Sequence, residues 1–155
     1  MELKLSQCKS LRGEIKVSAD KSISHRAIIF SSLAKGKSMV KNFLQAQDTF
    51  STCRCLSQLG VDIQTERQGL IISGKGWHGL KEADELDCGN SGTTMRLLSG
   101  LLSGRPFFSV LTGDHSLRQR PMRRVMEPLR MMGAAIYSRQ DGRAPVAVIG
   151  NNLRG

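Results

Sequence analysis

The sequence predicts an α/β fold built from two copies of one unit, each with its elements in the order βαβαββ. Short apolar runs typical of strands alternate with longer runs that have helical periodicity. Glycines stand where the helices are expected to end, among them Gly36 and Gly104. The same succession of elements occurs twice in 155 residues, which indicates an internal repeat in a chain long enough to bury a core.

The first unit is assigned to residues 19–80, and its opening strand lies just before it at residues 14–17. A polar turn at residues 22–26 leads into a helix, and a strand, a second helix and a strand pair follow. These elements are expected at residues 27–33, 38–43, 49–59, 61–65 and 69–73. An acidic residue, Asp48, stands in the loop before the second helix, where such residues commonly cap helices.

The second unit is assigned to residues 81–155 and repeats this plan. Its elements are expected at residues 85–87, 97–102, 107–111, 122–132, 135–139 and 145–149, with a polar turn at residues 91–96. Asp114 stands in the loop that corresponds to the loop of Asp48 in the first unit. The two loops therefore occupy equivalent places in the repeat.

The formal net charge of +10 indicates an anionic partner. Nucleic acid is a frequent partner of such basic chains. Here the 23 lysines and arginines alternate with apolar residues and gather only around turns, and aromatic residues make up 5% of the chain, which leaves little to stack on bases. We expect small anionic ligands and no nucleic acid; a non-enzymatic basic protein that binds anions or nucleic acid is the alternative.

The cysteines do not form a metal-binding or disulfide pattern. No two of the four have Cys-x-x-Cys spacing, and the three histidines are not placed near them in a zinc pattern. No segment has the apolar length of a signal peptide core or a membrane span. We therefore expect reduced thiols, a cytoplasmic location, no metal, and no membrane partner.

The first candidate binding segment contains Lys21, Ser22 and Arg26 at the expected start of a helix. Lysine supplies a movable charge, arginine a planar fork and serine a hydroxyl. The helix dipole disfavours cations at this end, so their placement is better explained if a bound anion neutralises them. The alternative is a simple helix cap by Ser22 or Ser24 with solvated charges.

The second candidate segment combines Asn90, Gly92, Thr93 and Arg96 before another helix. A small-residue turn that opens a helix leaves backbone N–H groups free to bind anions, and Gly92 lets a ligand approach the backbone closely. The alternative is a glycine turn needed only for chain reversal, which explains the glycines but not Arg96.

The third candidate segment ends in Arg120 and Pro121. Pro121 is expected at the first position of the next helix, where its missing N–H has no cost. Arg120 would then lie at the start of that helix, suited to a bidentate grip on carboxylate or phosphate. The alternative is a solvated basic loop.

Together, the three segments resemble those of 5-enolpyruvylshikimate-3-phosphate synthase (3-phosphoshikimate 1-carboxyvinyltransferase), the enolpyruvyl transferase of the shikimate pathway and aromatic amino acid biosynthesis. The matching segments are D-K-S-I-S-H-R-A at residues 20–27, G-N-S-G-T-T-M-R-L at 89–97 and R-x-R-P-M at 118–122. Their order and spacing match over essentially the whole chain. The resemblance implies an enolpyruvyl transferase (inside-out α/β barrel) fold. It also implies transfer of the enolpyruvyl group of phosphoenolpyruvate to shikimate 3-phosphate, with release of phosphate and no cofactor.

The residue matches also imply individual roles. The residues expected to hold shikimate 3-phosphate are Lys21, Ser22 and Arg26. Those expected to bind phosphoenolpyruvate are Lys21, Asn90, Gly92 and Arg120, supported by Thr93 and Arg96. The herbicide glyphosate would occupy the phosphoenolpyruvate site.

The family has two domains of three such repeats each, so we expect these 155 residues to form an incomplete domain. Residues 1–18 would pair with the second domain, and the acid–base groups would lie in the missing part, which leaves no catalytic residue assigned in this chain. The expected partner is therefore a C-terminal portion. Three explanations stay open: an excised piece, a natural half that assembles with a separate remainder, or a stand-alone binding protein.

The related UDP-N-acetylglucosamine enolpyruvyl transferase is the nearest alternative enzyme. It usually carries a cysteine in the loop before its Arg-Pro motif. The corresponding loop here, residues 112–120, has none, and Cys88 lies before the Gly-Asn turn. The sequence therefore favours the shikimate enzyme.

Overall fold

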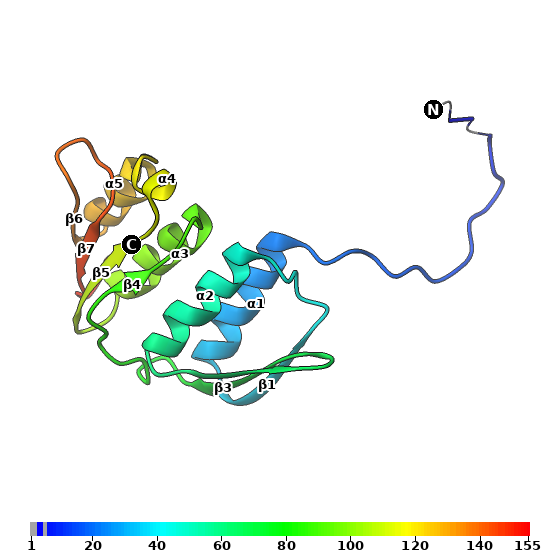
Figure 1. The fold of residues 1–155 in the computed structure, drawn as a ribbon, viewed down its shortest axis with the longest axis horizontal. Coiled ribbons are helices and arrows are strands. Elements are labelled where there is room, and N and C mark those ends of the chain that lie inside the picture. The colour runs from blue at the N-terminus through cyan, green and yellow to red at the C-terminus, as the bar shows by residue number, and fades with distance from the viewer. Residues whose placement is uncertain (1–2, 5) are drawn as a thin grey trace.

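The computed structural model describes residues 3–4 and 6–155. Its body consists of two α/β units, joined by a linker at residues 76–85 (Figure 1). In each unit the helices cover one face of a sheet, and the second helix of the first unit packs against the first helix of the second. In the described part of the chain, no helix combines the length and the hydrophobicity needed to cross a bilayer.

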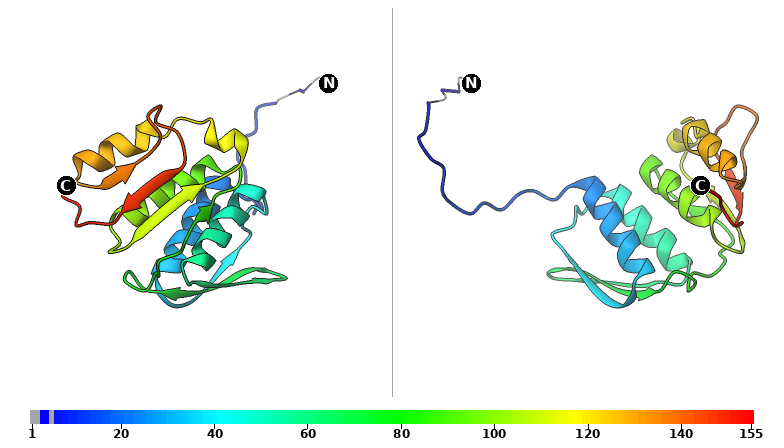
Figure 2. Two further views of the ribbon diagram at one scale, coloured as in Figure 1. Left: turned by 60° about the vertical axis from the view of Figure 1, so that its left-hand side comes forward. Right: turned by 180° about the vertical axis from the view of Figure 1, so that it is seen from behind.

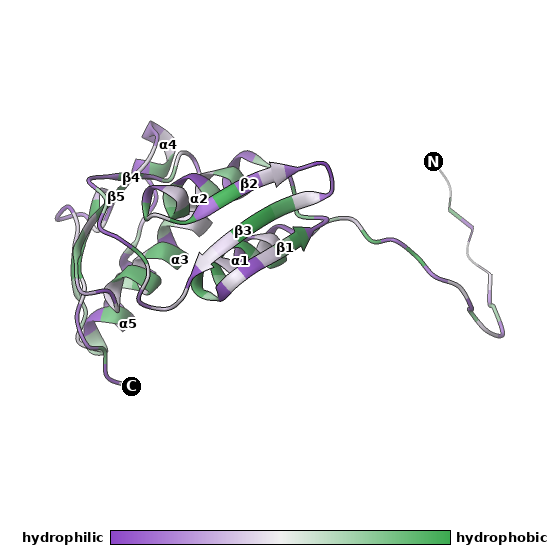
Figure 3. Ribbon diagram, turned by 90° about the horizontal axis from the view of Figure 1, so that it is seen from below, coloured by the Kyte–Doolittle hydropathy of each residue, from purple (hydrophilic) through white to green (hydrophobic). Residues whose placement is uncertain are grey.

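The first unit contains two helices on a three-stranded antiparallel sheet. Its elements are α1 (Lys21–Leu33), β1 (Lys35–Lys41), α2 (Gln47–Gln58), β2 (Asp62–Glu66) and β3 (Gly69–Lys75), with the strand order β1-β3-β2. Leu70 and Ile72 of the central strand are buried under the helices with Ile28 and Leu56. In hydropathy, β3 contains an apolar stretch, whereas the start of β1 is polar (Figure 3).

The second unit contains a four-stranded sheet in the order β4-β5-β7-β6 (Figure 2). Its elements are β4 (Leu86–Asp87), α3 (Gly92–Ser103), β5 (Phe108–Thr112), α4 (His115–Arg118), α5 (Arg123–Met131), β6 (Ala135–Tyr137) and β7 (Val146–Ile149). β4 runs parallel to β5, and the other pairs are antiparallel. The one-turn helix α4 was not predicted, because its loop has no apolar periodicity beyond Leu117.

The predicted strand at residues 14–17 is not formed. These residues belong to an extended, exposed segment that leaves the body of the molecule (Figure 1). A strand requires a neighbouring strand to pair with, and the Val17 carbonyl only accepts a 3.4 Å hydrogen bond from the side chain of Asn42. The first unit therefore has the order αβαββ, whereas the second has the predicted opening strand.

Two helices begin earlier than predicted. α1 begins at Lys21 rather than residue 27, and α3 at Gly92 rather than residue 97. The side chains of Asp20 and Ser91 cap them by accepting hydrogen bonds from the third amide that follows, at 2.7 and 3.1 Å. The polar segments are therefore the first turns of helices instead of turns before them.

Arg105 fastens the linker between the units. Its side chain is buried, lies 4.1 Å from the ring centroid of Trp77 and donates a hydrogen bond to the Trp77 carbonyl. Burial lowers the pKa of this guanidinium. Gly150 passes so close to the Arg105 backbone that a Cβ there would overlap the Arg105 carbonyl. Arg105 thus joins the linker to the end of α3, where its amide donates to the Leu102 carbonyl, and the segment after β7 passes close to its backbone.

Replacing Arg105 with alanine is expected to lower the free energy of unfolding by about 1–3 kcal/mol, since a cation–π contact with the half-exposed Trp77 and a part-buried hydrogen bond are both lost. Trp77 is the sole tryptophan of the chain, so chemical denaturation followed by its fluorescence measures the change directly. Arg67→Ala, at an exposed position in the turn between β2 and β3, is the matched control. Equal stabilities of the two variants would contradict the role assigned to Arg105.

Candidate functional site

The first turn of α1 carries Lys21 and Ser22, but its cap differs from the prediction. Asp20, not Ser22 or Ser24, caps the helix, with a carboxylate oxygen 2.7 Å from the Ile23 amide. Since α1 begins at Lys21, Arg26 lies in the second turn rather than the first. A carboxylate already satisfies part of this helix end, so the charge available for an anion comes from the side chains.

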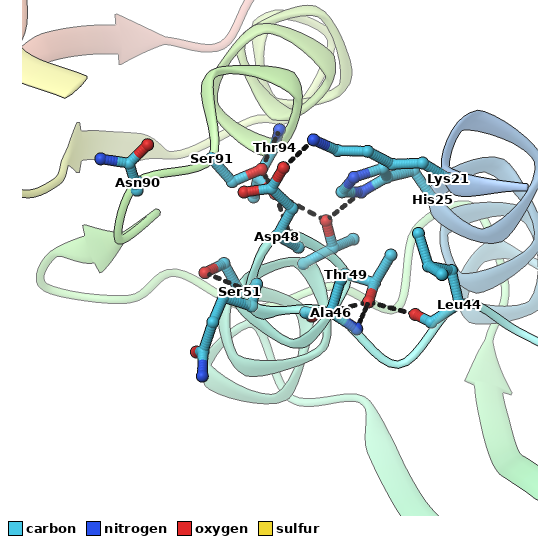
Figure 4. Close-up of polar contacts among 12 residues, drawn as sticks. Lys21, His25, Leu44, Ala46, Asp48, Thr49, Ser51, Asn90, Ser91 and Thr94 are labelled. Atoms are coloured by element: carbon cyan, nitrogen blue, oxygen red, sulfur yellow. Dashed lines mark hydrogen bonds and ion pairs between the residues drawn. The ribbon is translucent and has the colours of Figure 1, made fainter. Parts of the chain in front are cut away.

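Lys21 forms an ion pair with Asp48, which lies in the first turn of α2 (Figure 4). Asp48 was expected to be a helix cap; instead the cap residue is Ala46, whose amide donates to the Thr49 hydroxyl at 3.2 Å. The backbone carbonyl of Asp48 also accepts a 3.2 Å hydrogen bond from the Thr94 hydroxyl. Asp48 therefore links the Lys21 ammonium to the first turn of α3.

The N-terminus of α3 is open to an anion. Ser91 satisfies the Thr94 amide, and no hydrogen-bond partner of the Gly92 and Thr93 amides occurs within residues 3–4 and 6–155. The first turn contains no acidic residue. Free N–H groups and the positive end of a three-turn helix favour negative charge at this place.

Two guanidinium groups lie beside Gly92. A Cβ built on Gly92 would lie 2.7 Å from Nη1 of Arg96 and 3.4 Å from Nη1 of Arg120. Arg96 also donates to the Pro121 carbonyl at 3.3 Å, which fixes its position. Cations at a helix N-terminus oppose the dipole, so this arrangement is most favourable when an anion lies among them.

Asn90 lies between a cation and an anion. Its side-chain oxygen accepts a 2.6 Å hydrogen bond from Arg120, and its side-chain nitrogen donates to Asp114 at 2.7 Å. The other oxygen of Asp114 caps α4 by accepting a 2.7 Å hydrogen bond from the Leu117 amide. Asp114 thereby orients the Asn90 amide, and Asn90 in turn holds Arg120.

The position of Pro121 differs from the prediction. It lies two residues before α5, whose cap is Met122, and it forms an isolated β-bridge with Arg143. Arg120 accordingly belongs to the connection between α4 and α5 rather than to the start of α5. The bridge holds this connection against the loop after β6, which leaves Arg120 free to point toward Asn90.

The structure brings most of the predicted site residues together. Asn90, Gly92, Arg96 and Arg120 are in one cluster, and Lys21 reaches its edge through Asp48. Three predicted residues lie apart from these side-chain contacts in the described part of the chain: Ser22 and Arg26 are exposed on α1, and Thr93 is half-buried in the first turn of α3. No group of three potential metal ligands occurs among the described residues.

Asp48 and Asp114 received no site role from the sequence, yet each contacts a predicted binding residue of its own unit. The signal that could have found them is their equivalence in the repeat, since each follows the strand after the first helix of its unit. A carboxylate that recurs at the same place beside two basic motifs indicates a shared role in holding them.

Acidification should break the hydrogen bond between the Asn90 side chain and the Asp114 carboxylate only at low pH. The Leu117 amide, the Asn90 side chain and Arg120 hold the pKa of Asp114 below its ordinary value of 3.8. Because a lowered pKa keeps the carboxylate charged, its interactions persist above that value and are lost as the pH falls through the folded-state pKa. The NMR signals of the Asn90 side-chain amide should stay constant from pH 7 to 4 and move only below 3.8. Asp114→Asn should shift them already at pH 7, and a midpoint above 3.8 would contradict the geometry.

Comparison with known proteins agrees with the resemblance of the three segments. The family profile described as EPSP synthase (3-phosphoshikimate 1-carboxyvinyltransferase) matches residues 5–155. Two proteins of that enzyme name, from Syntrophomonas wolfei and Chloroflexus aurantiacus, are 58% and 56% identical over 152 and 154 residues, in each case 97% of this chain.

The structure of EPSP synthase from Acinetobacter baumannii superposes on 92% of this chain with a TM-score of 0.86 and 46% identity. This chain covers 33% of that structure, and it spans 36% and 35% of the lengths of the two relatives above. The fold of the two units is thus that of part of an enolpyruvyl transferase domain, and the chain belongs to the EPSP synthase family.

Proposed function

We propose that this chain is the N-terminal part of an enzyme that transfers the enolpyruvyl group of phosphoenolpyruvate to shikimate 3-phosphate. The observation that carries the proposal is the cluster at the start of α3. There the guanidinium groups of Arg96 and Arg120 flank Gly92, and the Lys21 ammonium reaches the same helix turn through Asp48. Such a cluster suits a small molecule with a phosphate and a carboxylate.

The cluster offsets the repulsion between two polyanionic substrates. In the proposed assignment, phosphoenolpyruvate occupies the space around Asn90, Gly92 and Arg120, and shikimate 3-phosphate lies against Ser22 and Arg26 of α1. Lys21 stands between the two groups. Positive side chains and free amides placed in advance lower the cost of bringing like charges together.

The reaction requires proton movements that this cluster does not supply. The 5-hydroxyl of shikimate 3-phosphate attacks C2 of phosphoenolpyruvate and gives its proton to a base, while C3 takes a proton from an acid. The tetrahedral intermediate then loses phosphate from C2 and a proton from C3, which restores the double bond. Asp48 and Asp114 are each engaged by a basic or amide group, so we assign the acid–base groups to a C-terminal portion of the enzyme, with which the exposed residues 6–18 would also pair.

The two alternatives have weaker support. The loop of residues 112–120 contains no cysteine, which speaks against the UDP-N-acetylglucosamine transferase. A general nucleic-acid binder would not need Asn90 and Arg120 held in a defined geometry by Asp114. Its affinity for random DNA would also be strongly salt-dependent, which a filter-binding assay measures.

A chimera tests the proposal most directly. Residues 1–155 replace the matching part of the Syntrophomonas wolfei relative, and phosphate release is measured with both substrates. We expect turnover in the chimera, none in the 155-residue chain alone, and a loss of at least a hundredfold in kcat/KM for Lys21→Ala or Arg26→Ala, since each removes a charge that contacts a substrate phosphate. Lys37→Ala, on the exposed face of β1, should leave turnover unchanged. A folded chimera without turnover would refute the assignment.

Gly92→Ala tests whether the absence of a side chain at this position leaves the space that the ligand occupies. The new methyl group would lie 2.7 Å from Nη1 of Arg96, and because a guanidinium at the end of a flexible side chain can move, the fold should persist. The displaced groups then narrow the phosphoenolpyruvate pocket, and glyphosate, which is the longer molecule, should lose about tenfold more affinity than phosphoenolpyruvate. Equal losses for both, measured as KM and inhibition constant in the chimera, would refute the steric assignment.

A further inference from the structure

A line of buried hydrogen-bonding side chains crosses three helices beneath the proposed site (Figure 4). His25 Nδ1 of α1 lies 2.7 Å from the Thr52 hydroxyl of α2, which lies 2.7 Å from the Thr94 hydroxyl of α3. Thr94 lies 2.7 Å from the hydroxyl of Ser91, the cap of α3. The exposed fraction of these four residues is 1% or less. None of them was assigned a role in substrate binding.

We assign the direction of the hydrogen bonds from the Asp48 carbonyl, which can only accept. In the direction that we assign, the Thr94 hydroxyl donates to that carbonyl or to Ser91, its oxygen accepts from Thr52, and Thr52 accepts from Nδ1–H of His25. This assignment places a proton on Nδ1 of His25. Its Nε2 is buried and has no partner among the described residues.

A proton on Nε2 would be unfavourable. It would place a second, unpaired N–H and a positive charge in a buried position beside Lys21. Burial, followed by the charge of Lys21, lowers the pKa of His25 from 6.5. The groups that face this region from the packed helices are Lys21 of α1, Asp48 of α2, and the uncharged Thr94 of α3.

We propose that His25 is a positioning residue whose Nδ1–H, through Thr52 and Thr94, sets the place of the Ser91–Gly92 turn relative to Lys21. Apolar contacts between α2 and α3 have no preferred direction and allow the two helices to shift along each other. Hydrogen bonds of 2.7 Å are directional and therefore define the relative position of the helices. The turn thus takes its position from the helix that carries the other substrate-binding residues. This inference deepens the proposed function and rests on it for its consequence in catalysis.

The first test uses the 155-residue chain without substrate. Thr52→Val removes one hydroxyl at constant shape, and His25→Leu removes the donor. Both should raise hydrogen exchange at the Thr94 amide about tenfold and shift the signals of residues 91–95. His25→Asn, whose amide nitrogen can replace Nδ1–H, should restore the native values. Ser99→Ala is the control, because among the described residues that buried hydroxyl bonds within α3 alone, to the Met95 carbonyl.

Nitrogen NMR of the imidazole tests the assignment of the proton. His25 should show protonated Nδ1 and bare Nε2 at pH 7 and should gain its second proton only below the ordinary pKa of 6.5. A proton on Nε2 at pH 7 would overturn the proposed direction of the hydrogen bonds.

The second test uses the chimera. If His25 positions the turn, Thr52→Val and His25→Leu should raise KM for phosphoenolpyruvate about fivefold and change KM for shikimate 3-phosphate much less, while His25→Asn restores both. Unchanged exchange in residues 91–95 of Thr52→Val, or an equal rise throughout the chain including β6 and β7, would overturn the positioning role. A chimera without turnover whose isolated chain shows the expected exchange pattern would instead refute the proposed function alone.

Discussion

The contact between the hydroxyls of Thr52 and Thr94 is the constraint on which the arrangement of the site depends. It joins two helices from different units at the level where α3 begins, and both groups are buried. A buried hydroxyl without a partner costs free energy, so the two helices have one favourable register rather than a range of them. The ends of α1 and α3 that carry the basic residues are held in that register.

The two acidic residues explain how so many cations can be held together. Lys21 is paired with Asp48, and Arg120 is linked to Asp114 through Asn90. In each unit the carboxylate follows the strand after the first helix, so the repeat supplies one acidic support for each basic motif. Arg96 has a different support, the Pro121 carbonyl. The cluster is therefore held by groups from both units. In the second unit these groups come from three loops, which lie before α3, before α4 and before α5.

The sequence predicted most of the order of elements, apart from the strand at residues 14–17 and helix α4, and most of the residues that cluster around α3. Apolar periodicity and glycines are local signals, and they located both strand pairs and the long helices. The start of α1 was missed because residues 21–26 are polar except for Ile23 and show no apolar periodicity. The residue that decides where the helix begins is Asp20, whose carboxylate accepts a hydrogen bond from the Ile23 amide. The pairs Lys21–Asp48 and Asn90–Asp114 join residues 27 and 24 positions apart, and no local pattern gives such contacts. The predicted strand at residues 14–17 failed because pairing depends on a neighbour and not on alternation alone.

The carboxylates also limit what the site can bind. An anion that enters must compete with Asp48 for Lys21, and with the Asn90 oxygen for Arg120. A single weak charge gains little from such an exchange, because the cations are already partly compensated. A ligand with two anionic groups at a fixed separation can engage the Arg96–Arg120 pair and the free amides of α3 together, and the second contact then forms without a further loss of translational freedom. The compensated cluster therefore favours compact dianions over isolated charges, which is the discrimination that the proposed substrate, with both a phosphate and a carboxylate, would require.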